Sequence, residues 1–213
     1  MGFLPEGVSL DGVVAGHFSS TEGSDFVLYG RRTDGTGDYL GVLRGGPGDI
    51  GSSYSVPAEG GAAGGAAWDR AVAVGDATGD GYADIAVGAP YEDVDGHRNV
   101  GDVVFLRGGS TGLTTTGAQS WHQATPGVPG AAEAGDHFGS SLRLRDVNGN
   151  GRADLAIGAF GEDVVPGGYD DGSAWVLRGV TSGLTTSYAT AFNPTDFGFP
   201  VVKGCKFADV FAR

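Results

Sequence analysis

Residues 146–159 read DVNGNGRADLAIGA, and residues 76–89 read DATGDGYADIAVGA. The two stretches begin 70 residues apart and place glycine, alanine and oxygen-bearing side chains at matching positions. The same spacing relates Glu92-Asp93 to Glu162-Asp163. A repeat of this length is a supersecondary unit that buries its apolar faces by stacking on its neighbours. The chain is therefore expected to be a stack of similar units.

A weaker copy precedes these two units, and the opening of another follows them. Residues 25–28 (DFVL) stand where residues 84–87 (DIAV) stand in the second unit, but the loop before them lacks the acidic spacing. Phe197-Gly198 matches Phe138-Gly139 at the start of the third unit. We divide the chain into a degenerate first unit without a metal loop, two full units and the truncated start of a further one, at 1–63, 64–133, 134–190 and 191–213.

Apolar residues alternate over short runs within each unit. Leu142 and Leu144 fall on one face at period 2, and so do Leu155 and Ile157, whereas no stretch carries a helical stripe. The chain contains 42 glycines in 213 residues, and glycine adopts positive φ in tight turns at little cost. We predict an all-β fold, a partial β-propeller of about three four-stranded blades plus the start of a fourth.

Composition excludes several classes of protein. A net charge of -13 argues against nucleic acid or an anionic membrane as partner. No apolar run approaches the roughly 18 residues of a membrane span. Cys205 is the only cysteine, so an intrachain disulfide cannot form. The first residues lack the basic and apolar regions of a secretory signal.

The loop at residues 146–154 has the spacing of calcium ligands. Oxygen-bearing side chains occupy positions 1, 3, 5 and 9, with glycine at position 6 and a backbone carbonyl available at position 7. Ca²⁺ takes six to eight oxygen ligands at about 2.3–2.6 Å, which such a loop can supply. The candidate ligands are Asp146, Asn148, Asn150, Asp154 and the Arg152 carbonyl.

The loop at residues 76–84 repeats this pattern with one departure. Thr78 replaces a carboxylate or amide at position 3, while Asp80 adds a charge that Asn150 lacks. Position 12 carries valine or isoleucine instead of the EF-hand glutamate, so both loops are expected to lie within β-hairpins. Asp-Gly and Asn-Gly are also plain hairpin-turn signals, and that alternative stays open. The candidate ligands here are Asp76, Thr78, Asp80, Asp84 and the Tyr82 carbonyl.

Signals for catalysis are weak. Residues 108–112 (GGSTG) match G-x-S-x-G but lack the strand–turn–helix context of a nucleophile elbow. The four histidines lack metal-ligand spacing, and no phosphate-binding loop is present. Glu92-Asp93 and Glu162-Asp163 are interpreted as solvated loop acids in preference to a glycosidase pair. We predict that this module is not an enzyme.

Phe138-Gly139, the Asp/Asn loop and Gly158-Ala159 together resemble the FG-GAP repeat of integrin α-subunit propellers and their bacterial relatives. In the second unit Gly88-Ala89-Pro90 matches the second signature, whereas Trp68-Asp69 stands where Phe-Gly is expected. The resemblance implies a calcium-stabilised β-propeller, extracellular or at the cell surface, that serves adhesion or ligand binding. Integrin-type propellers have seven blades, and this chain has about half of that.

We therefore expect a calcium-binding, non-catalytic recognition module with a protein or glycan ligand. Two alternatives are the accessory repeat region of a secreted, phospholipase-like hydrolase and a carbohydrate-binding propeller. Successive turns of an up-and-down blade fall on alternate ends, so the long loops at 90–99 and 160–171 would lie opposite the calcium loops. These loops carry Tyr91, Phe160 and Tyr169 and are expected to form the ligand surface.

A partial propeller leaves its two outer blades without a neighbour. Apolar patches of that size normally mark an association site, so we expect self-association through the open faces. The residues expected on these faces are Leu4, Val13 and Val14 at one end and Phe192, Phe197 and Phe199 at the other.

Overall fold

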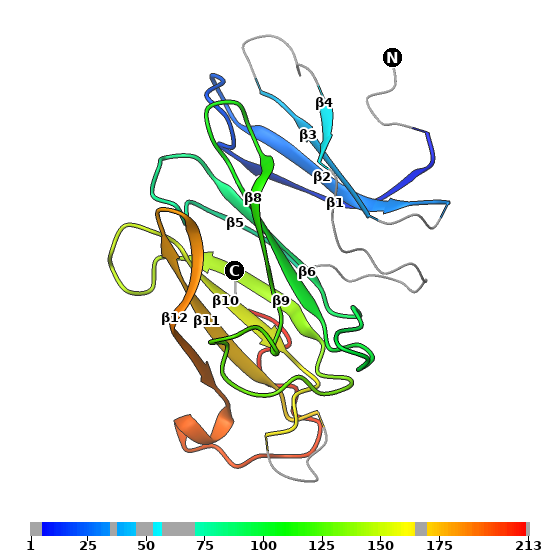
Figure 1. Cartoon of the computed structure of the whole chain (residues 1–213), viewed down its shortest axis with the longest axis vertical. Coiled ribbons are helices and arrows are strands. Elements are labelled where there is room, and N and C mark those ends of the chain that lie inside the picture. The colour runs from blue at the N-terminus through cyan, green and yellow to red at the C-terminus, as the bar shows by residue number, and fades with distance from the viewer. Residues whose placement is uncertain (1–5, 35–37, 46–52, 57–70, 165–169, 212–213) are drawn as a thin grey trace.

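The computed structural model describes residues 6–34, 38–45, 53–56, 71–164 and 170–211. These residues form three antiparallel four-stranded sheets, each with its strands in chain order (Figure 1). Among the sequence predictions, those on Leu4, Trp68-Asp69, Tyr169 and the unit boundary at 63/64 lie outside the described residues.

The strands of each sheet follow one another along the chain. The first sheet contains β1 (Val8–Gly16), β2 (Asp25–Arg32), β3 (Asp38–Leu43) and β4 (Ser53–Val56). The second contains β5 (Val72–Gly75), β6 (Asp84–Ala89), β7 (Asp102–Arg107) and β8 (Thr114–Trp121). The third contains β9 (Phe138–Arg145), β10 (Asp154–Ala159), β11 (Ser173–Val180) and β12 (Gly183–Phe192). This arrangement confirms the all-β fold of partial propeller blades.

The sheets are stacked face to face, with the second sheet between the other two (Figure 1). Alternation along each strand sends one set of side chains to each face of a sheet. In the second sheet, Ile85 packs toward the first sheet, and Ala86 and Phe105 pack toward the third. Each interface therefore holds its own apolar cluster, and the middle sheet contributes to both.

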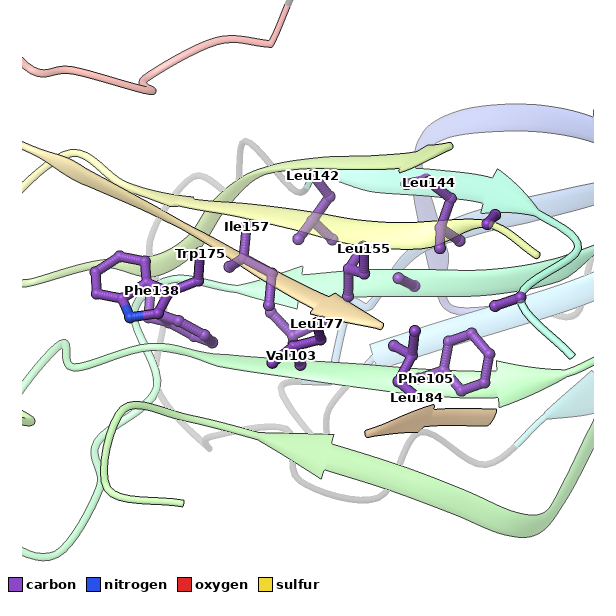
Figure 2. Close-up of a cluster of buried hydrophobic side chains, with 14 of the residues drawn as sticks. Val103, Phe105, Phe138, Leu142, Leu144, Leu155, Ile157, Trp175, Leu177 and Leu184 are labelled. Carbon is purple, nitrogen blue, oxygen red and sulfur yellow. The ribbon is translucent and has the colours of Figure 1, made fainter. Parts of the chain in front are cut away.

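The larger cluster lies between the second and third sheets (Figure 2). Phe138 meets Trp175 edge-on, with ring centroids 5.2 Å apart. The Trp175 indole N–H donates to the Pro129 carbonyl at 2.8 Å, so its polar atom is satisfied although the ring is buried. Burying one such large side chain contributes roughly 1.5–3 kcal/mol. The phenylalanine of Phe138-Gly139 is thus a core residue of the interface.

The glycine of the same pair allows the two sheets to approach closely. A Cβ on Gly88 would overlap the carbonyl oxygen of Gly139. Gly139 itself has φ of +87°, a conformation that side chains rarely adopt. Gly88-Ala89 at the end of β6 and Phe138-Gly139 at the start of β9 are therefore the two halves of one backbone contact between successive sheets.

The last described residues repeat the start of the third sheet. The Phe207 N–H donates to the Asp171 carbonyl at 2.9 Å, just as the Phe138 N–H donates to the Val100 carbonyl at 2.8 Å. Ala208 follows with φ of +61°, in the left-handed region. Its carbonyl oxygen lies against Gly158 as the Gly139 carbonyl lies against Gly88. Phe207-Ala208 therefore occupies the place where a further unit would open.

The expected match of Phe197-Gly198 to this position is wrong. Phe197 ends the four-residue 3-10 helix η1 (Pro194–Phe197), and Gly198 caps it with φ of +76°. Phenylalanine followed by glycine was the sequence signal, but the contacts are made ten residues later by a pair with alanine in place of glycine. Within the described residues η1 is the one helix, and it is too short to cross a membrane.

The outer faces of the stack carry exposed apolar side chains. Val13 on β1 is 57% exposed, and Phe197 and Phe199 near the other end are 57% and 65% exposed. Val14 was expected beside Val13, but it packs against the inner cluster between the first two sheets. The reason is strand alternation, because neighbouring residues of a strand point to opposite faces.

Candidate functional site

The loop between β9 and β10 is organised around the carboxylate of Asp146. Its Oδ1 accepts from the N–H groups of Gly149 and Asn150 at 2.7 and 3.2 Å, and its Oδ2 accepts from Gly151 at 2.8 Å. Asn150 Oδ1 in turn accepts from the Arg152 N–H at 2.8 Å. The hydrogen bond from Gly151 is the main cause that lowers the pKa of Asp146, so the carboxylate is ionised at neutral pH.

The loop between β5 and β6 has the same arrangement. Asp76 Oδ1 accepts from Gly79 at 2.6 Å, and its Oδ2 accepts from Gly81 at 2.8 Å. Asp80 Oδ1 accepts from the Tyr82 N–H at 2.9 Å. The first and fifth positions thus shape both loops in the same way. The ninth-position ligands, Asp84 and Asp154, are the first residues of the strands that follow, β6 and β10.

The carboxylate at the ninth position ties each loop to the end of the third strand of its own sheet. Asp84 accepts from Ala77 N–H at 2.8 Å and from Gly108 N–H at 2.9 Å. Asp154 likewise accepts from Gly179 N–H at 3.0 Å. Burial is the main cause that raises the pKa of Asp84 to about 6. Both side chains are buried, so this position has a structural role whether or not a metal binds.

The first sheet keeps this anchor although it lacks the acidic loop. Asp25 at the start of β2 accepts from Gly45 N–H at 2.9 Å and from the Thr21 hydroxyl at 2.9 Å. It is fully buried. Asp25 is thus the equivalent of the ninth-position aspartate, in a unit whose loop lacks the acidic residues at the other ligand positions.

The two loops lie next to each other along the stack. Arg152 Nε donates to the Thr78 carbonyl at 3.1 Å, and the Ala153 N–H donates to the Asp76 carbonyl at 2.7 Å. The guanidinium of Arg152 therefore lies against the loop of the preceding unit. A cation in this place, together with threonine at position 3, makes the loop at 76 the less favourable of the two for Ca²⁺.

The donor set fits a hard cation by its chemistry. The loop at 146 offers carboxylate, amide and carbonyl oxygens, and the loop at 76 offers carboxylate, hydroxyl and carbonyl oxygens. Oxygen ligands of these types are the ones that Ca²⁺ prefers. Across the described ranges no three acidic, histidine or cysteine side chains converge as a metal cluster. In the loop at 146, the Asn148 amide donates to both oxygens of Asp154, at 3.0 and 2.8 Å. Positions 3 and 9 of this loop are therefore in direct contact, through the amide nitrogen of Asn148.

The loops at the opposite end of the sheets carry an aromatic row. His137 stacks on Phe160 at 4.6 Å between centroids and meets Tyr91 edge-on at 4.9 Å. Its Nδ1 lies 3.0 Å from the Pro90 carbonyl, and burial lowers its pKa. The ammonium of Lys206 lies 4.7 Å from the Phe160 ring centre. The long loops after β6 and β10 are thus joined to the entry into β9.

A buried polar group at this same end was missed by the sequence analysis. Gln123 is 1% exposed, and its amide donates to Glu162 Oε2 at 2.5 Å and to the Ala131 carbonyl at 3.2 Å. Asp136 is 2% exposed and accepts from the Glu133 N–H at 2.6 Å. Glu162 was interpreted as a solvated loop acid, but the structure places its side chain half-buried against Gln123.

Burial raises the pKa of both carboxyls in this group to about 7, with desolvation as the largest cause. Repulsion from Asp136 is the second cause for Glu162, and Glu133 and Asp163 raise both values further. Sequence reasoning could not find this group, because Gln123 and Asp136 lie in an irregular segment between β8 and β9 and share no motif with Glu162.

The G-x-S-x-G stretch has an ordinary structural place. Residues 108–112 form the turn between β7 and β8, closed by a hydrogen bond from the Gly112 N–H to the Gly109 carbonyl at 2.8 Å. Ser110 is therefore followed by a strand, where a nucleophile elbow requires a helix.

The FG-GAP repeat family model matches residues 69–106 and 138–177 of the chain. The two matched segments run from the start of one unit through its loop into the third strand, so they include both candidate calcium loops.

Curated relatives match a similar region at moderate identity. Integrin alpha-V of Gallus gallus is 34% identical over 138 residues, which cover 64% of this chain and 12% of that protein. Integrin alpha-IIb of Homo sapiens is 41% identical over 93 residues, covering 43% and 8%. Phosphatidylinositol-glycan-specific phospholipase D of Homo sapiens is 36% identical over 80 residues, covering 38% and 9%. The chain thus spans only a small part of the length of these relatives.

Three stacked sheets, a phenylalanine and glycine pair at the sheet interface and a loop of aspartate and asparagine in each of two units all agree with these matches. The chain contains FG-GAP repeats and is distantly similar to integrin alpha subunits and to phosphatidylinositol-glycan-specific phospholipase D.

Proposed function

We propose that the chain is a calcium-binding FG-GAP module used for adhesion or ligand recognition, without catalytic activity of its own, in an extracellular or cell-surface protein. The observation that supports it best is the pair of matching loops, in which Asp76 and Asp146 accept three backbone N–H groups each. This arrangement, with the position-5 side chain accepting from the N–H of position 7, holds positions 1 and 5 in one tight turn.

A bound calcium ion would be held in each loop by the oxygens predicted from the sequence, and would supply positive charge to a group of like-charged oxygens. The chain's own residues fix the conformation of each loop. Asp84 and Asp154 anchor the loop to the neighbouring turn, and the glycines at positions 4 and 6 adopt positive φ in both loops. Stiff loops at one end then keep neighbouring sheets in register.

Thermal unfolding after chelation and re-addition of calcium tests the proposal. A ligand at 100 times its Kd that binds only the folded state adds about 2.7 kcal/mol, which is a rise of several degrees in a domain of this size. Asp146→Ala should remove most of the rise and Asp76→Ala a smaller share. An unchanged melting temperature on adding calcium to the wild-type chain would refute it.

The ligand surface is proposed to lie on the loops after β6 and β10, at the end opposite the calcium loops. The aromatic row of Tyr91, His137 and Phe160 supports this, because aromatic side chains on a rigid scaffold are common in recognition surfaces. Binding to a glycan array would favour the carbohydrate-binding alternative, and Tyr91→Ala should then weaken that binding while Tyr188→Ala, a change of an exposed tyrosine on β12, should not.

The likeness to phosphatidylinositol-glycan-specific phospholipase D favours a second candidate, in which the module accompanies a secreted hydrolase. The two candidates differ in what adjoins the repeats in the gene. Sequencing the DNA on both sides of this segment separates them, since a hydrolase domain in the same reading frame supports the second candidate and further repeats alone support the first.

A further inference from the structure

The third sheet differs from the other two at the last residue of its first strand. In the first two sheets this residue is a glycine, Gly16 in β1 and Gly75 in β5, and it pairs with the aspartate that begins the second strand. In the third sheet the same position is Arg145, which pairs with Asp154. A long charged side chain therefore stands where the two preceding sheets have none.

The glycine at this position gives room to the sheet that follows. A Cβ on Gly16 would lie 3.0 Å from Val74 Cγ1, on the first strand of the second sheet. A Cβ on Gly75 would lie 2.9 Å from Leu144 Cβ, on the first strand of the third sheet. An arginine at this position occupies the space that a following sheet needs.

Two more arginines lie on the same outer face. Arg143 shares this face with Arg145, because Leu144 between them points into the cluster shared with the second sheet. Arg178 on β11 points the same way, since its neighbour Leu177 belongs to that cluster. Within the described ranges no ion pair joins any of the three arginines to a carboxylate. Covering this face with an apolar sheet would bury unpaired charges, which is costly.

The other end of this face is covered by the chain itself. The Ser141 hydroxyl donates to the Ala208 carbonyl at 2.5 Å, and the same carbonyl lies against Gly158. The part of the face that stays open is therefore the part with the arginines.

The outer face of the first sheet, at the opposite end of the stack, is apolar (Figure 1). In the pairing of β1 with β2, the exposed side chains of Leu10, Val13 and Phe26 fall on this one face. Phe26 is 40% exposed, whereas Ile85 and Leu155, which also follow the first aspartate of their strands, are fully buried against a neighbouring sheet. This face has the side chains of a sheet interface without the second sheet.

Two copies of the chain can meet through these faces in three ways. Two basic faces repel each other. A basic face on an apolar face buries arginines without partners. Two apolar faces cover each other's exposed side chains and bury none of the three arginines, so charge favours this pairing.

We propose that the outer face of the first sheet binds the same face of a second copy across a two-fold axis. A patch that pairs with itself closes at two copies and leaves no such patch for a third. The dimer is then one longer stack whose two ends are the basic faces of the third sheets.

Light scattering coupled to gel filtration of the full chain tests the proposal. At tens of micromolar, the wild-type chain should have twice the mass of one chain, and Phe26→Asp should have the mass of one. Phe199→Asp is the matched control, because it places the same charge at an exposed phenylalanine near the other end of the stack, and it should stay dimeric. Val13→Asp, at a more exposed side chain, replaces Phe26→Asp if that variant does not fold.

Mixing tagged and untagged proteins separates this symmetric pairing from a head-to-tail one. Tagged wild-type chain should capture untagged wild type, whereas tagged Phe26→Asp should capture none, although its basic face is intact. Capture by tagged Phe26→Asp would overturn the proposal. So would a monomeric wild type, a mass that grows beyond two copies with concentration, or a monomeric Phe199→Asp.

Discussion

The second strand of each of the three sheets begins with an aspartate that makes the same hydrogen bond. Asp25, Asp84 and Asp154 each accept the N–H of a glycine at the end of the third strand or just after it. In two sheets this residue also belongs to a predicted calcium loop. In the first sheet it does not, so Asp25 allows the structural role to be measured without the metal.

Replacing Asp25 with alanine should destabilise the chain by about 1–3 kcal/mol, because the half-buried Gly45 N–H would lose its hydrogen-bond acceptor. The loss should be equal with and without calcium. Chemical denaturation in the two conditions measures it. Asp11→Ala is the control, since Asp11 lies at the bulge of β1 and its ion pair with Arg31 is long, at 3.9 Å, and of the kind worth about 0–1 kcal/mol. Equal stability of Asp25→Ala and Asp11→Ala would show that the anchor is dispensable.

Gly88 is required for the contact between the second and third sheets. A methyl group there would overlap the Gly139 carbonyl, so Gly88→Ala should lower the free energy of unfolding by more than the roughly 1 kcal/mol typical of a point mutation. Gly109→Ala is the matched change, because nothing lies within 4 Å of a Cβ there. Denaturation midpoints compare the two variants. Similar midpoints would mean that the sheets separate at little cost.

At the scale of the elements, strands and sheets were predictable because each unit repeats and its apolar residues alternate. The Phe-Gly and Gly-Ala signatures could be read from the sequence, but their contact could not. Gly88 and Gly139 lie together because successive sheets stack. Phe207-Ala208 escaped prediction because its contacts depend on backbone conformation, which alanine adopts here despite a φ of +61°. The burial of Gln123 and Asp136 could not be predicted, because both lie in the irregular segment between β8 and β9, which has no periodic apolar pattern.

The pairing of β7 with β8 contains a buried carboxyl that makes stability depend on pH. Burial is the main cause that raises the pKa of Asp102, while the Ser120 hydroxyl, which donates to both oxygens at 2.8 and 2.7 Å, opposes it, as does the charge of His122. A carboxyl whose pKa is higher in the folded state favours folding when protonated. Its contribution is complete below the unfolded pKa of about 4 and is lost as the pH rises through the raised value.

The expected result is that Asp102→Asn loses stability less steeply than the wild-type chain as the pH rises from 4 upward. Asparagine keeps an oxygen that accepts from Ser120 and removes the buried charge. The measurement is the free energy of unfolding from urea titrations in chelator at several pH values. Parallel pH profiles for the two proteins would show that Asp102 does not titrate differently in the folded and unfolded states.

At the scale of the whole molecule, three stacked sheets leave an open face at each end of the stack. Val13 on β1 is exposed at one end, and Phe199 is exposed near the other. The middle sheet buries both of its faces, one against each apolar cluster, whereas each outer sheet contributes to one cluster only. Two copies joined through such faces would bury surface that a single copy leaves in water.

We therefore predict self-association at micromolar concentration, weakened by Val13→Asp. Val147→Asp is the control, because Val147 is 63% exposed but lies in the turn between β9 and β10, away from the face of the first sheet. Light scattering coupled to gel filtration gives the molar mass of each. A sharply melting wild-type monomer would contradict the prediction, and so would equal association of the two variants.

The repeated aspartate loops are expected to bind calcium, and calorimetric titration of the chelated chain with calcium chloride measures this binding directly. The wild-type chain and the Asp76→Ala, Asp146→Ala double variant are compared at the same concentration. We expect saturable binding in the wild type and two sites fewer in the double variant. The same number of calcium ions bound by both proteins, or no binding by either, would contradict it.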